Sequence, residues 1–463
     1  MTGVLRFEQL PLDYHSNVRF GSVINTAGSS FQMPAFAPTP RLRYEARAVL
    51  RLARAGAPIP AMIVPISTRQ SVVSELGAYI GRAVQRTLDG RNLSPTRPLV
   101  VPDPESEALA LGVDARLRFQ RDSLPISESF SSLLSTGLES DSRKSRSETC
   151  AEWDRVRLDF GLAGLASWFE RATAQAGANV FLAPTPLIRA NVKSVKRAFD
   201  IGWQIADTIE IAFDAVGIHL LIHSEVFSES AEAVASCRAI ASSIGQLYRD
   251  PNPRNFPIIS LKLLDPSRSL SSGPEASVRR RNFGGLMLRC AEEIHRANGL
   301  LVVQNVGTWA LGLLDCGADI VGARGNGKTL DVEAIRGHPA LTRSNGRGIS
   351  AGQRIEHKAR SAIHVQPFDP VELADSKLAD VKRQWTRTQA FPVAEHVTPE
   401  PFWTYDVSRQ REYRALQVFG SLVQLAAELR SASTGPIPLR DSIRDRIERM
   451  REHDAMFDIC PSL

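Results

Sequence analysis

The feature that most constrains this sequence is a repeated alternation of short apolar segments with longer amphipathic segments. Apolar runs rich in Val, Ile, Leu and Ala are typical of buried strands, and the stretches that follow most of them have helical periodicity. The predicted strands cover residues 34–39, 61–66, 98–103, 178–185, 217–223, 257–264, 299–306 and 318–323. Strands that alternate with helices pair in parallel. The pattern therefore predicts an α/β fold, specifically a (β/α)8 TIM-type barrel, with an open doubly wound sheet as the main rival.

Three regions lie outside the barrel pattern or interrupt it. Residues 1–32 form a lead-in, in which TAGSS supplies the turn residues of an N-terminal β-hairpin. Residues 119–149, an insert after the third strand, are rich in Ser and charge, which predicts a loop that is at least partly mobile. Residues 331–463 form a C-terminal extension that is predicted to be largely helical. The barrel itself is assigned to residues 33–330.

Charge and cysteine usage limit the possible partners and metal sites. The net charge of +6 is carried by Arg more than by Lys, which favours an anionic partner such as nucleic acid, a nucleotide or an acidic metabolite, although a genome that favours Arg codons would give the same balance. The five cysteines form no CxxC or CxC pair, so we expect no structural metal. The sequence has no apolar leader and no apolar stretch long enough to span a membrane, which predicts a cytoplasmic protein.

Polar residues gather where the predicted strands end, and β/α barrels place their active sites at the carboxyl ends of the strands. His223 and Glu225 occupy alternate positions, which would direct both toward one face as a base and acid pair. Lys262 lies among apolar residues, so an inward-facing Lys262 needs a carboxylate partner, and an outward-facing one has no such role. The residues at or just past strand ends are Asp103, Glu105, Thr185, His223, Glu225, Lys262, Asp265, Gln304, Asn305, Thr308 and Arg324.

Two basic segments are candidates for binding phosphate. The segment GARGNGK follows the eighth strand, and barrels often bind phosphate there, so Arg324 and Lys328 fit such a site. A run of three arginines, Arg279, Arg280 and Arg281, lies at the start of a predicted helix. The run would suit a nucleic-acid backbone, although a solvated helix end is the alternative.

Three segments, in order along the chain, resemble the tRNA-guanine transglycosylases, including the related branch that acts on DNA. They are VRFGSVINTAGSSFQMPAFAP at 18–38, PLVVPDPESEALALG at 98–112 and LLVVQNVGTWALGLLDCGADIVGARGNG at 300–327. Members of this family are barrels that break the glycosidic bond of a guanine nucleotide and insert a deazapurine. One Asp exchanges protons and a second Asp attacks the sugar covalently. The resemblance therefore implies a pentosyltransferase that acts on tRNA or DNA without a cofactor.

The resemblance assigns candidate catalytic residues but leaves out part of the family's site. Asp103 would take the acid–base position, and Asp319 matches the family's Gly-Val-Asp position. The nucleophile position, three residues later, is Gly322, which has no carboxylate. Asp214, which follows Ala-Phe, would match the base-recognising Asp, although periodicity also places it at a helix end. The family's zinc ligands are missing, because residues 324–400 contain no Cys.

The sequence leaves three functions open. The first is a base-exchange enzyme with Asp103 and Asp319 as catalytic residues. The second is a non-catalytic subunit that binds nucleic acid or a partner, with a homodimer among the possibilities. The third is a small-molecule barrel enzyme, a lyase or isomerase that acts on a phosphorylated substrate through Lys262 and His223. The residues predicted to bind substrate are Thr185, Asp214, His223, Glu225, Lys262 and Thr308.

Overall fold

The structure is a computed structural model of the 463-residue chain, and it describes the strands and most of the helices around them. The described residues are 5–9, 18–25, 28, 30–40, 43–54, 57, 59–66, 98–106, 162–174, 176–211, 213–249, 258–264, 269–270, 274–304, 313–314, 316–324 and scattered helical positions between 412 and 430. The predicted insert at 119–149, most of the extension after 330, Thr308 and Lys328 lie outside them.

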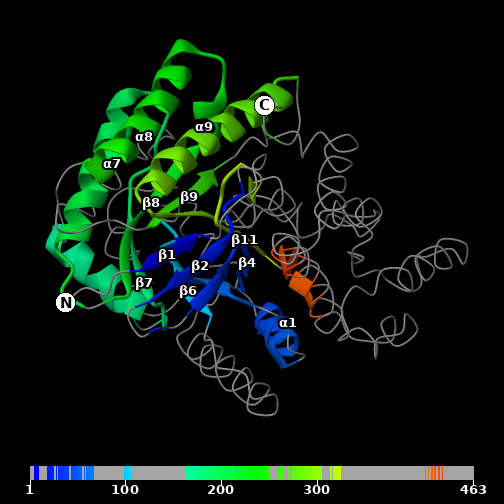
Figure 1. The fold of residues 1–463 in the computed structure, drawn as a ribbon. Coiled ribbons are helices and arrows are strands. Elements are labelled where there is room, and N and C mark those ends of the chain that lie inside the picture. The colour runs from blue at the N-terminus through cyan, green and yellow to red at the C-terminus, as the bar shows by residue number, and fades with distance from the viewer. Residues whose placement is uncertain are drawn as a thin grey trace, which may run out of the picture.

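All eight predicted strands are present, and all their pairings are parallel (Figure 1). Six of them form one sheet in the order β4-β11-β10-β9-β8-β7. Their bounds are β4 Ala35–Pro38, β7 Val180–Pro184, β8 Ala215–His223, β9 Ile258–Leu264, β10 Leu300–Gln304 and β11 Ile320–Ala323. The other two, β5 Ala61–Pro65 and β6 Leu99–Asp103, form a separate parallel pair. The predicted α/β class with parallel strands is therefore confirmed.

The two faces of the strands pack into different apolar clusters. One face of every one of the eight strands enters a single inner cluster, to which β4 gives Ala35 and Ala37 and β9 gives Ile258. The other face enters a second cluster that it shares with the helices, to which β9 gives Ile259 and Leu261. This alternation explains why the strands read as continuous apolar runs, because a strand covered on both faces has no polar side.

The separate pair β5–β6 lies next to both ends of the main sheet. β5 is adjacent to β4, and β6 is adjacent to β7. Asn179, which precedes β7, joins β6 to β7, because its backbone N–H donates to Val100 O over 3.0 Å and its side-chain oxygen accepts from Val100 N over 2.9 Å. The eight strands therefore follow one another in space from β4 through β5, β6 and β7 to β11.

Helices cover the outer face of the strands. They are α1 Arg43–Arg54, a helical stretch at 162–174, α7 Val192–Asp207, α8 Ala231–Arg249 and α9 Ala276–Arg296, of which α7, α8 and α9 pack in sequence (Figure 1). Helix α7 begins where Asn191 accepts from the Ser194 N–H, as an N-cap residue does. Gly202 lets this helix approach β8, because a Cβ there would lie 2.9 Å from the Thr185 methyl carbon and 3.0 Å from an Ile218 methyl carbon.

The N-terminal lead-in is a three-stranded antiparallel sheet, one strand larger than the predicted hairpin. It comprises β1 Arg6–Gln9, β2 Gly21–Ile24 and β3 Ser30–Met33. Its apolar side chains, Leu5, Phe7, Val23, Phe31 and Met33, join the inner cluster of the eight strands. Polar contacts also link the lead-in to Asp214 and Asp319, the residues immediately before β8 and β11. The small sheet therefore covers the amino ends of the strands.

The described positions between 412 and 430 bring the C-terminal extension against the body. Phe419 is fully buried with its ring centroid 6.4 Å from that of Phe36 in β4, and Glu412 pairs with Arg51 of α1 over 3.1 Å. The extension is predicted to be largely helical, and these described positions are helical. None of the helices in the described part of the chain combines the length and apolar character needed to cross a membrane.

Candidate functional site

A buried ion pair lies at the carboxyl ends of the strands. Asp103 is the last residue of β6, and Lys262 lies near the end of β9. Lys262 Nζ is 2.8 Å from Asp103 Oδ1 and 2.7 Å from Oδ2, and the two side chains are only 2% and 1% exposed. Lys262 thus faces inward, and the carboxylate that it requires is Asp103 rather than Glu225. Burying two charges is costly, so such a pair persists only where its geometry is well satisfied.

Backbone geometry next to Asp103 strengthens this arrangement. Glu105 is buried and has φ 52°, a left-handed conformation that is uncommon for residues other than Gly, Asn and Asp. This conformation directs the Glu105 N–H to Asp103 Oδ1 over 3.0 Å. Strained backbone of this kind is concentrated at functional sites, where the surrounding structure maintains it. The loop after β6 is therefore shaped to hold the Asp103 carboxylate in place.

His219 lies on β8, in register with Pro184 of β7 and Ser260 of β9. Its Nδ1 is 3.0 Å from Ser260 Oγ, and its Nε2 has no hydrogen-bond partner among the described residues. Burial lowers the pKa of His219 to about 3, an effect that the negative charge of Asp103 opposes and the positive charge of Lys262 adds to. The imidazole is therefore neutral at neutral pH, close enough to the ion pair for both charges to act on it.

Two further buried polar atoms at this end have no hydrogen-bond partner among the described residues. Gln304, the last residue of β10, is in register with Lys262 and donates its Nε2 to Pro102 O over 3.0 Å, but its Oε1 accepts no bond. Ser106 Oγ, after β6, is the other. Buried polar atoms are nearly always bonded, so His219 Nε2, Gln304 Oε1 and Ser106 Oγ keep unused hydrogen-bonding capacity at this end, as Arg19 Nη1, Tyr248 Oη and Arg280 Nε do elsewhere in the described residues.

The predicted pair His223 and Glu225 does meet, but through a turn rather than along a strand. His223 ends β8, and Glu225 lies in the 3₁₀ turn Ser224–Phe227. His223 Nδ1 accepts from the Glu225 N–H over 3.2 Å and lies 3.3 Å from the Glu225 carboxylate. Glu225 also contacts Arg189 over 3.5 Å. With Glu225 37% exposed, this group lies at the rim of the carboxyl end rather than beside the buried ion pair.

Thr185 and Arg324 also lie at the carboxyl ends, with other partners. Thr185 Oγ1 donates to His219 O over 2.9 Å and accepts from Leu221 N, so its hydroxyl group supports the backbone of β8. Arg324 directly follows β11, is buried, and faces the fully buried Glu45 of α1 over 3.9 Å. Arg324 Nε makes no hydrogen bond within the described residues. Arg324 is thus a buried cation whose hydrogen-bonding capacity is incompletely used.

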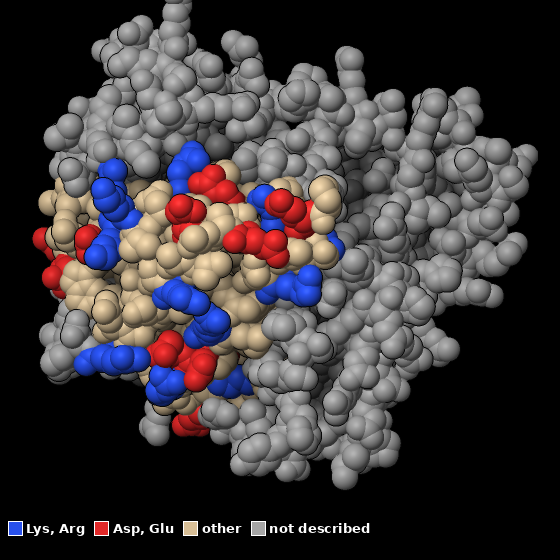
Figure 2. Space-filling view, turned by 90° about the horizontal axis from the view of Figure 1, so that it is seen from above, with Lys and Arg blue, Asp and Glu red and all other residues tan. Residues whose placement is uncertain are grey.

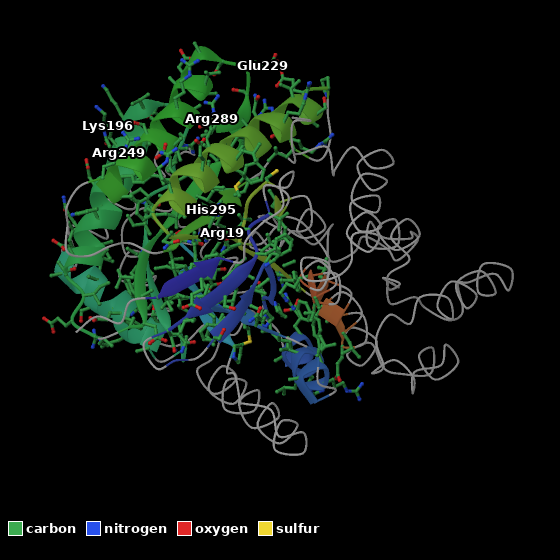
Figure 3. All side chains as sticks on the ribbon, viewed as in Figure 1. Arg19, Lys196, Glu229, Arg249, Arg289 and His295 are labelled. Carbon is green, nitrogen blue, oxygen red and sulfur yellow. The ribbon has the colours of Figure 1, made fainter. Side chains whose placement is uncertain are left out.

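Asp319, the second predicted catalytic residue, lies at the opposite end of the strands. It precedes β11 and is therefore at the amino end, whereas Asp103 ends β6. Arg19 Nε and Nη2 each donate to Asp319 over 2.9 Å, the Leu301 N–H donates over 2.8 Å, and His295 lies 3.2 Å from the carboxylate. Two of these partners, Arg19 and His295, are labelled close to each other in Figure 3. Burial acts to raise the pKa of Asp319, but Arg19 and His295 outweigh it and hold the pKa below its usual value. The structure therefore does not bring the two predicted catalytic residues, Asp103 and Asp319, together.

Asp214 is likewise at the amino end, apart from the other residues predicted to bind substrate. It immediately precedes β8, its N–H donates to Asn179 O, and its carboxylate accepts from Asn25 of the lead-in over 3.1 Å. Its position at a helix end is not found either, since α7 ends at Asp207. Both Asp214 and Asp319 precede an apolar run in the sequence, and such residues lie at the amino ends of parallel strands.

Gly322, at the position of the family's nucleophile, lies in the inner layer of the strands. It is in register with Ala37 of β4. A Cβ at this position would overlap the Ile63 side chain of β5 and lie 3.1 Å from Thr39 Oγ1. The space that a carboxylate would need is therefore occupied by Ile63, and the absence of a nucleophile here is built into the packing.

The three arginines predicted to contact a nucleic-acid backbone do not form a surface cluster. Arg280 is buried and donates to Leu270 O over 2.8 Å, which anchors the turn before α9. Arg279 pairs with Glu275 over 2.8 Å, and only Arg281 is exposed. Neighbouring residues of a helix point in different directions, so three consecutive arginines do not share one face. On the face shown in Figure 2, Lys and Arg alternate with Asp and Glu rather than forming a basic patch.

Other nucleophiles and metal ligands do not gather in the described part of the molecule. Burial raises the pKa of Cys237 to about 11 and that of Cys290 further, so neither thiol ionises near neutral pH. Within the described ranges, no three His, Cys, Asp or Glu side chains come together as a metal site requires. The buried groups of the carboxyl end are thus the best candidates for chemistry.

Comparisons with known proteins assign no family to this chain. No family model matches the sequence, and no curated protein sequence matches it. Among solved structures, the chain is similar to an HpcH/HpaI aldolase from Desulfitobacterium hafniense DCB-2, with 12% sequence identity and a TM-score of 0.26. The match covers 68% of this chain and 94% of the aldolase chain. A similarity at this level decides neither the fold nor the function.

Proposed function

We propose that the chain is a small-molecule barrel enzyme, of the lyase or isomerase type, that moves a proton next to the carbonyl group of an anionic substrate. The observation that carries the proposal is the buried contact between Lys262 and Asp103 at the carboxyl ends of the strands. Burying a charge pair away from water costs free energy. We propose that the pair is present because it takes part in the reaction, at the edge of the strands where β/α barrels have their active sites.

We further propose that the eight strands close into a (β/α)8 barrel. Two observations support closure. One face of all eight strands shares a single apolar cluster, as the interior of a closed barrel does, and the β5–β6 pair lies next to both β4 and β7. In such a barrel the amino ends lie beneath the lead-in sheet, so the carboxyl ends would be the open mouth.

The ion pair has the charges that proton transfer next to a carbonyl requires. In the proposed step, Asp103 accepts the proton from the carbon next to the carbonyl group, and the electron pair of that C–H bond moves onto the carbonyl oxygen. Asp103 becomes neutral as the oxygen becomes negative, so Lys262 exchanges one anionic partner for another at constant net charge. A fixed cation beside a developing oxyanion is a large source of catalysis in a site that excludes water.

Arg324 is the residue at this end best suited to the anionic group of the substrate. It is buried and follows the eighth strand, and its Nε, which lies 3.9 Å from Glu45 Oε1, donates no hydrogen bond within the described residues. Guanidinium groups bind phosphate and carboxylate through paired donors, and barrels often bind phosphate beside their last strands. A phosphorylated or carboxylated oxo compound is therefore the proposed substrate class.

Solvent hydrogen exchange tests this function even while the reaction product is unidentified. The full-length protein is incubated in D2O with a panel of small phosphorylated and carboxylated oxo compounds, and loss of each C–H signal next to the carbonyl group is followed by proton NMR. We expect exchange of at least one compound, and loss of that exchange in Asp103→Asn. The His295→Gln variant, which changes an amino-end residue, serves as the matched control. Absence of exchange across the panel rejects the proposal.

Base exchange on nucleic acid is the second candidate. It is favoured by the position of Asp103 at the end of the third of the eight strands, which is where the resemblance to the tRNA-guanine transglycosylases places the acid–base Asp. In this alternative Asp103 exchanges protons with a nucleobase. Incorporation of labelled guanine or deazaguanine into tRNA or duplex DNA that depends on Asp103 would replace the first proposal. Salt-sensitive binding to either nucleic acid without incorporation would favour a non-catalytic nucleic-acid-binding subunit.

A further inference from the structure

The His219 side chain extends the carboxyl-end site deeper between the strands. His219 and Lys262 belong to the same inward-facing set, because His219 pairs in register with Ser260, two residues before Lys262 on β9. The neighbouring Leu220 and Leu261 belong to the cluster shared with the helices. His219 is completely buried. A ligand that reaches the ion pair from the mouth would therefore have the imidazole beneath it.

The hydrogen bonds of Ser260 determine which ring nitrogen of His219 carries the proton. The hydroxyl group of Ser260 lies 3.0 Å from His219 Nδ1. Among the described residues, His219 Nδ1 is the acceptor to which the hydroxyl group of Ser260 can donate. A hydroxyl group that donates to Nδ1 leaves the proton of a neutral imidazole on Nε2. His219 is therefore assigned as the Nε2–H tautomer, with a buried N–H group that no described residue accepts.

The charged groups beside His219 leave this N–H for a ligand. Asp103 of β6 and Lys262 of β9 are the charges that act on the imidazole, and Asp103 already accepts two contacts from Lys262 and one from the Glu105 N–H. Burial keeps the ring neutral, since the pKa of His219 lies at about 3. A neutral N–H group next to a cation suits an oxygen that is uncharged in the substrate and negative in the transition state.

We propose that His219 Nε2–H donates a hydrogen bond to the carbonyl oxygen of the substrate, and that Ser260 positions it by fixing the tautomer. This inference rests on the proposed proton transfer and adds a second group that stabilises the carbonyl oxygen. Lys262 supplies a positive charge, and His219 supplies a directed hydrogen bond. A neutral donor polarises a carbonyl group without losing its own proton to the oxyanion, which an imidazolium would do more readily. Gln304 Oε1, also unpartnered among the described residues, would accept from a hydroxyl or amide group of the same substrate.

The tautomer is tested directly by NMR on the full chain labelled with ¹⁵N-histidine. The signal of His219, identified among nine histidines by its loss in His219→Gln, is expected to show a neutral ring protonated at Nε2 from pH 5 to pH 8. Ser260→Ala is expected to mix the two tautomers. A ring protonated at Nδ1, or one that becomes an imidazolium by pH 5, overturns the inference.

The role toward the substrate is tested with a compound that exchanges in D2O. Loss of one donor to an oxyanion slows such reactions by roughly 10²- to 10³-fold, so we expect His219→Leu to slow exchange by that factor. His219→Gln, which keeps an N–H donor, is expected to recover part of the rate, and His295→Gln to leave it unchanged. Thermal unfolding of each variant shows whether it is folded.

The two proposals fail in different ways. If exchange occurs and His219→Leu is folded but exchanges at the rate of the unaltered protein, the role of His219 is rejected while the proton transfer stands. If no compound exchanges although the NMR shows an Nε2–H tautomer, the proton transfer and the carbonyl contact are both rejected and the buried donor alone remains.

Discussion

The two ends of the strands each hold a buried ion pair, and the pairs differ in the parts of the chain that they join. At the amino end, Asp319 accepts from Nε and Nη2 of Arg19 and from the Leu301 N–H, and the Arg19 guanidinium lies 3.7 Å from the centre of the Phe7 ring, while Arg19 Nη1 has no hydrogen-bond partner among the described residues. At the carboxyl end, the pair joins Asp103 of β6 to Lys262 of β9, and His219 Nε2, Gln304 Oε1 and Ser106 Oγ have no hydrogen-bond partner among the described residues.

We therefore expect the amino-end pair to serve stability and the carboxyl-end pair to serve the reaction. Arg19 belongs to the lead-in, 300 positions from Asp319 along the chain, so its ion pair joins the lead-in sheet to the strands. Arg19 Nη1 is unpartnered as well, so unpartnered atoms alone do not distinguish the two ends. What distinguishes the carboxyl end is the strained residue Glu105 beside Asp103, at the end of the strands where β/α barrels place their active sites.

The largest expected effect comes from breaking the amino-end pair. Asp319→Leu leaves the Arg19 guanidinium buried without its carboxylate and the Leu301 N–H without its acceptor, so we expect the free energy of unfolding to fall by about 3–5 kcal/mol. Urea denaturation followed by circular dichroism measures this change. Under conditions where the variant is folded, its D2O exchange rate should equal that of the unaltered protein, and a folded variant without exchange would contradict the separation of the two ends.

The matched change at the carboxyl end sharpens this comparison. Asp103→Leu combined with Lys262→Met removes both charges, and replacing a whole buried pair by apolar residues is often neutral or stabilising. We therefore expect the double variant to lose exchange completely but to unfold at a urea concentration at or above that of the unaltered protein. A double variant as unstable as Asp319→Leu would show that the carboxyl-end pair serves stability instead.

A smaller effect is expected in the inner layer between the two ends. Gly322→Ala adds a methyl group against Ile63, and overpacking of this kind costs about 1–3 kcal/mol. Ile63→Val shortens the side chain that causes the overlap, so the combined variant should recover much of the loss in urea denaturation. Additive losses would mean that the inner layer is looser at Gly322 than its packing indicates.

The sequence predicts the strands well because each one is buried on both faces. Continuous apolar runs such as AMIVP of β5 and IISLKLL of β9 contain little that competes with a strand. The same burial makes Lys262 conspicuous, because a charge within such a run needs a partner. Which carboxylate supplies it depends on the packing of strands that are 159 positions apart, and the sequence leaves that choice open.

Other site residues are hidden from sequence reasoning for physical reasons. His219 lies inside the apolar run AVGIHLLIH, where a buried structural His and a functional one look alike, and its partner Ser260 is 41 positions away. Its alternation with His223 at even spacing is the signal that could have placed it on the inner face. From the sequence, Asp319 is grouped with Asp103 because a polar residue next to a strand can lie at either end of that strand. Asp319 precedes its apolar run, so it lies at the amino end.

The smallest predicted effect is a pH dependence that distinguishes His219 from groups at the amino end. Its pKa is about 3 in the folded chain, against an ordinary 6.5 when unfolded, so below pH 6.5 the unfolded state binds a proton that the folded state does not. The contribution of His219 to stability is therefore complete above pH 6.5 and is lost progressively as pH falls toward 3. Between pH 6 and pH 5 the loss is about 1 kcal/mol.

His219→Gln should remove this loss from urea denaturation curves, whereas Asp319→Leu should retain it, because the pKa of Asp319 lies below this pH range. Equal pH dependence in the unaltered protein and in His219→Gln would mean that the imidazole titrates in the folded chain, and the neutral donor proposed for the carboxyl end would be lost with it.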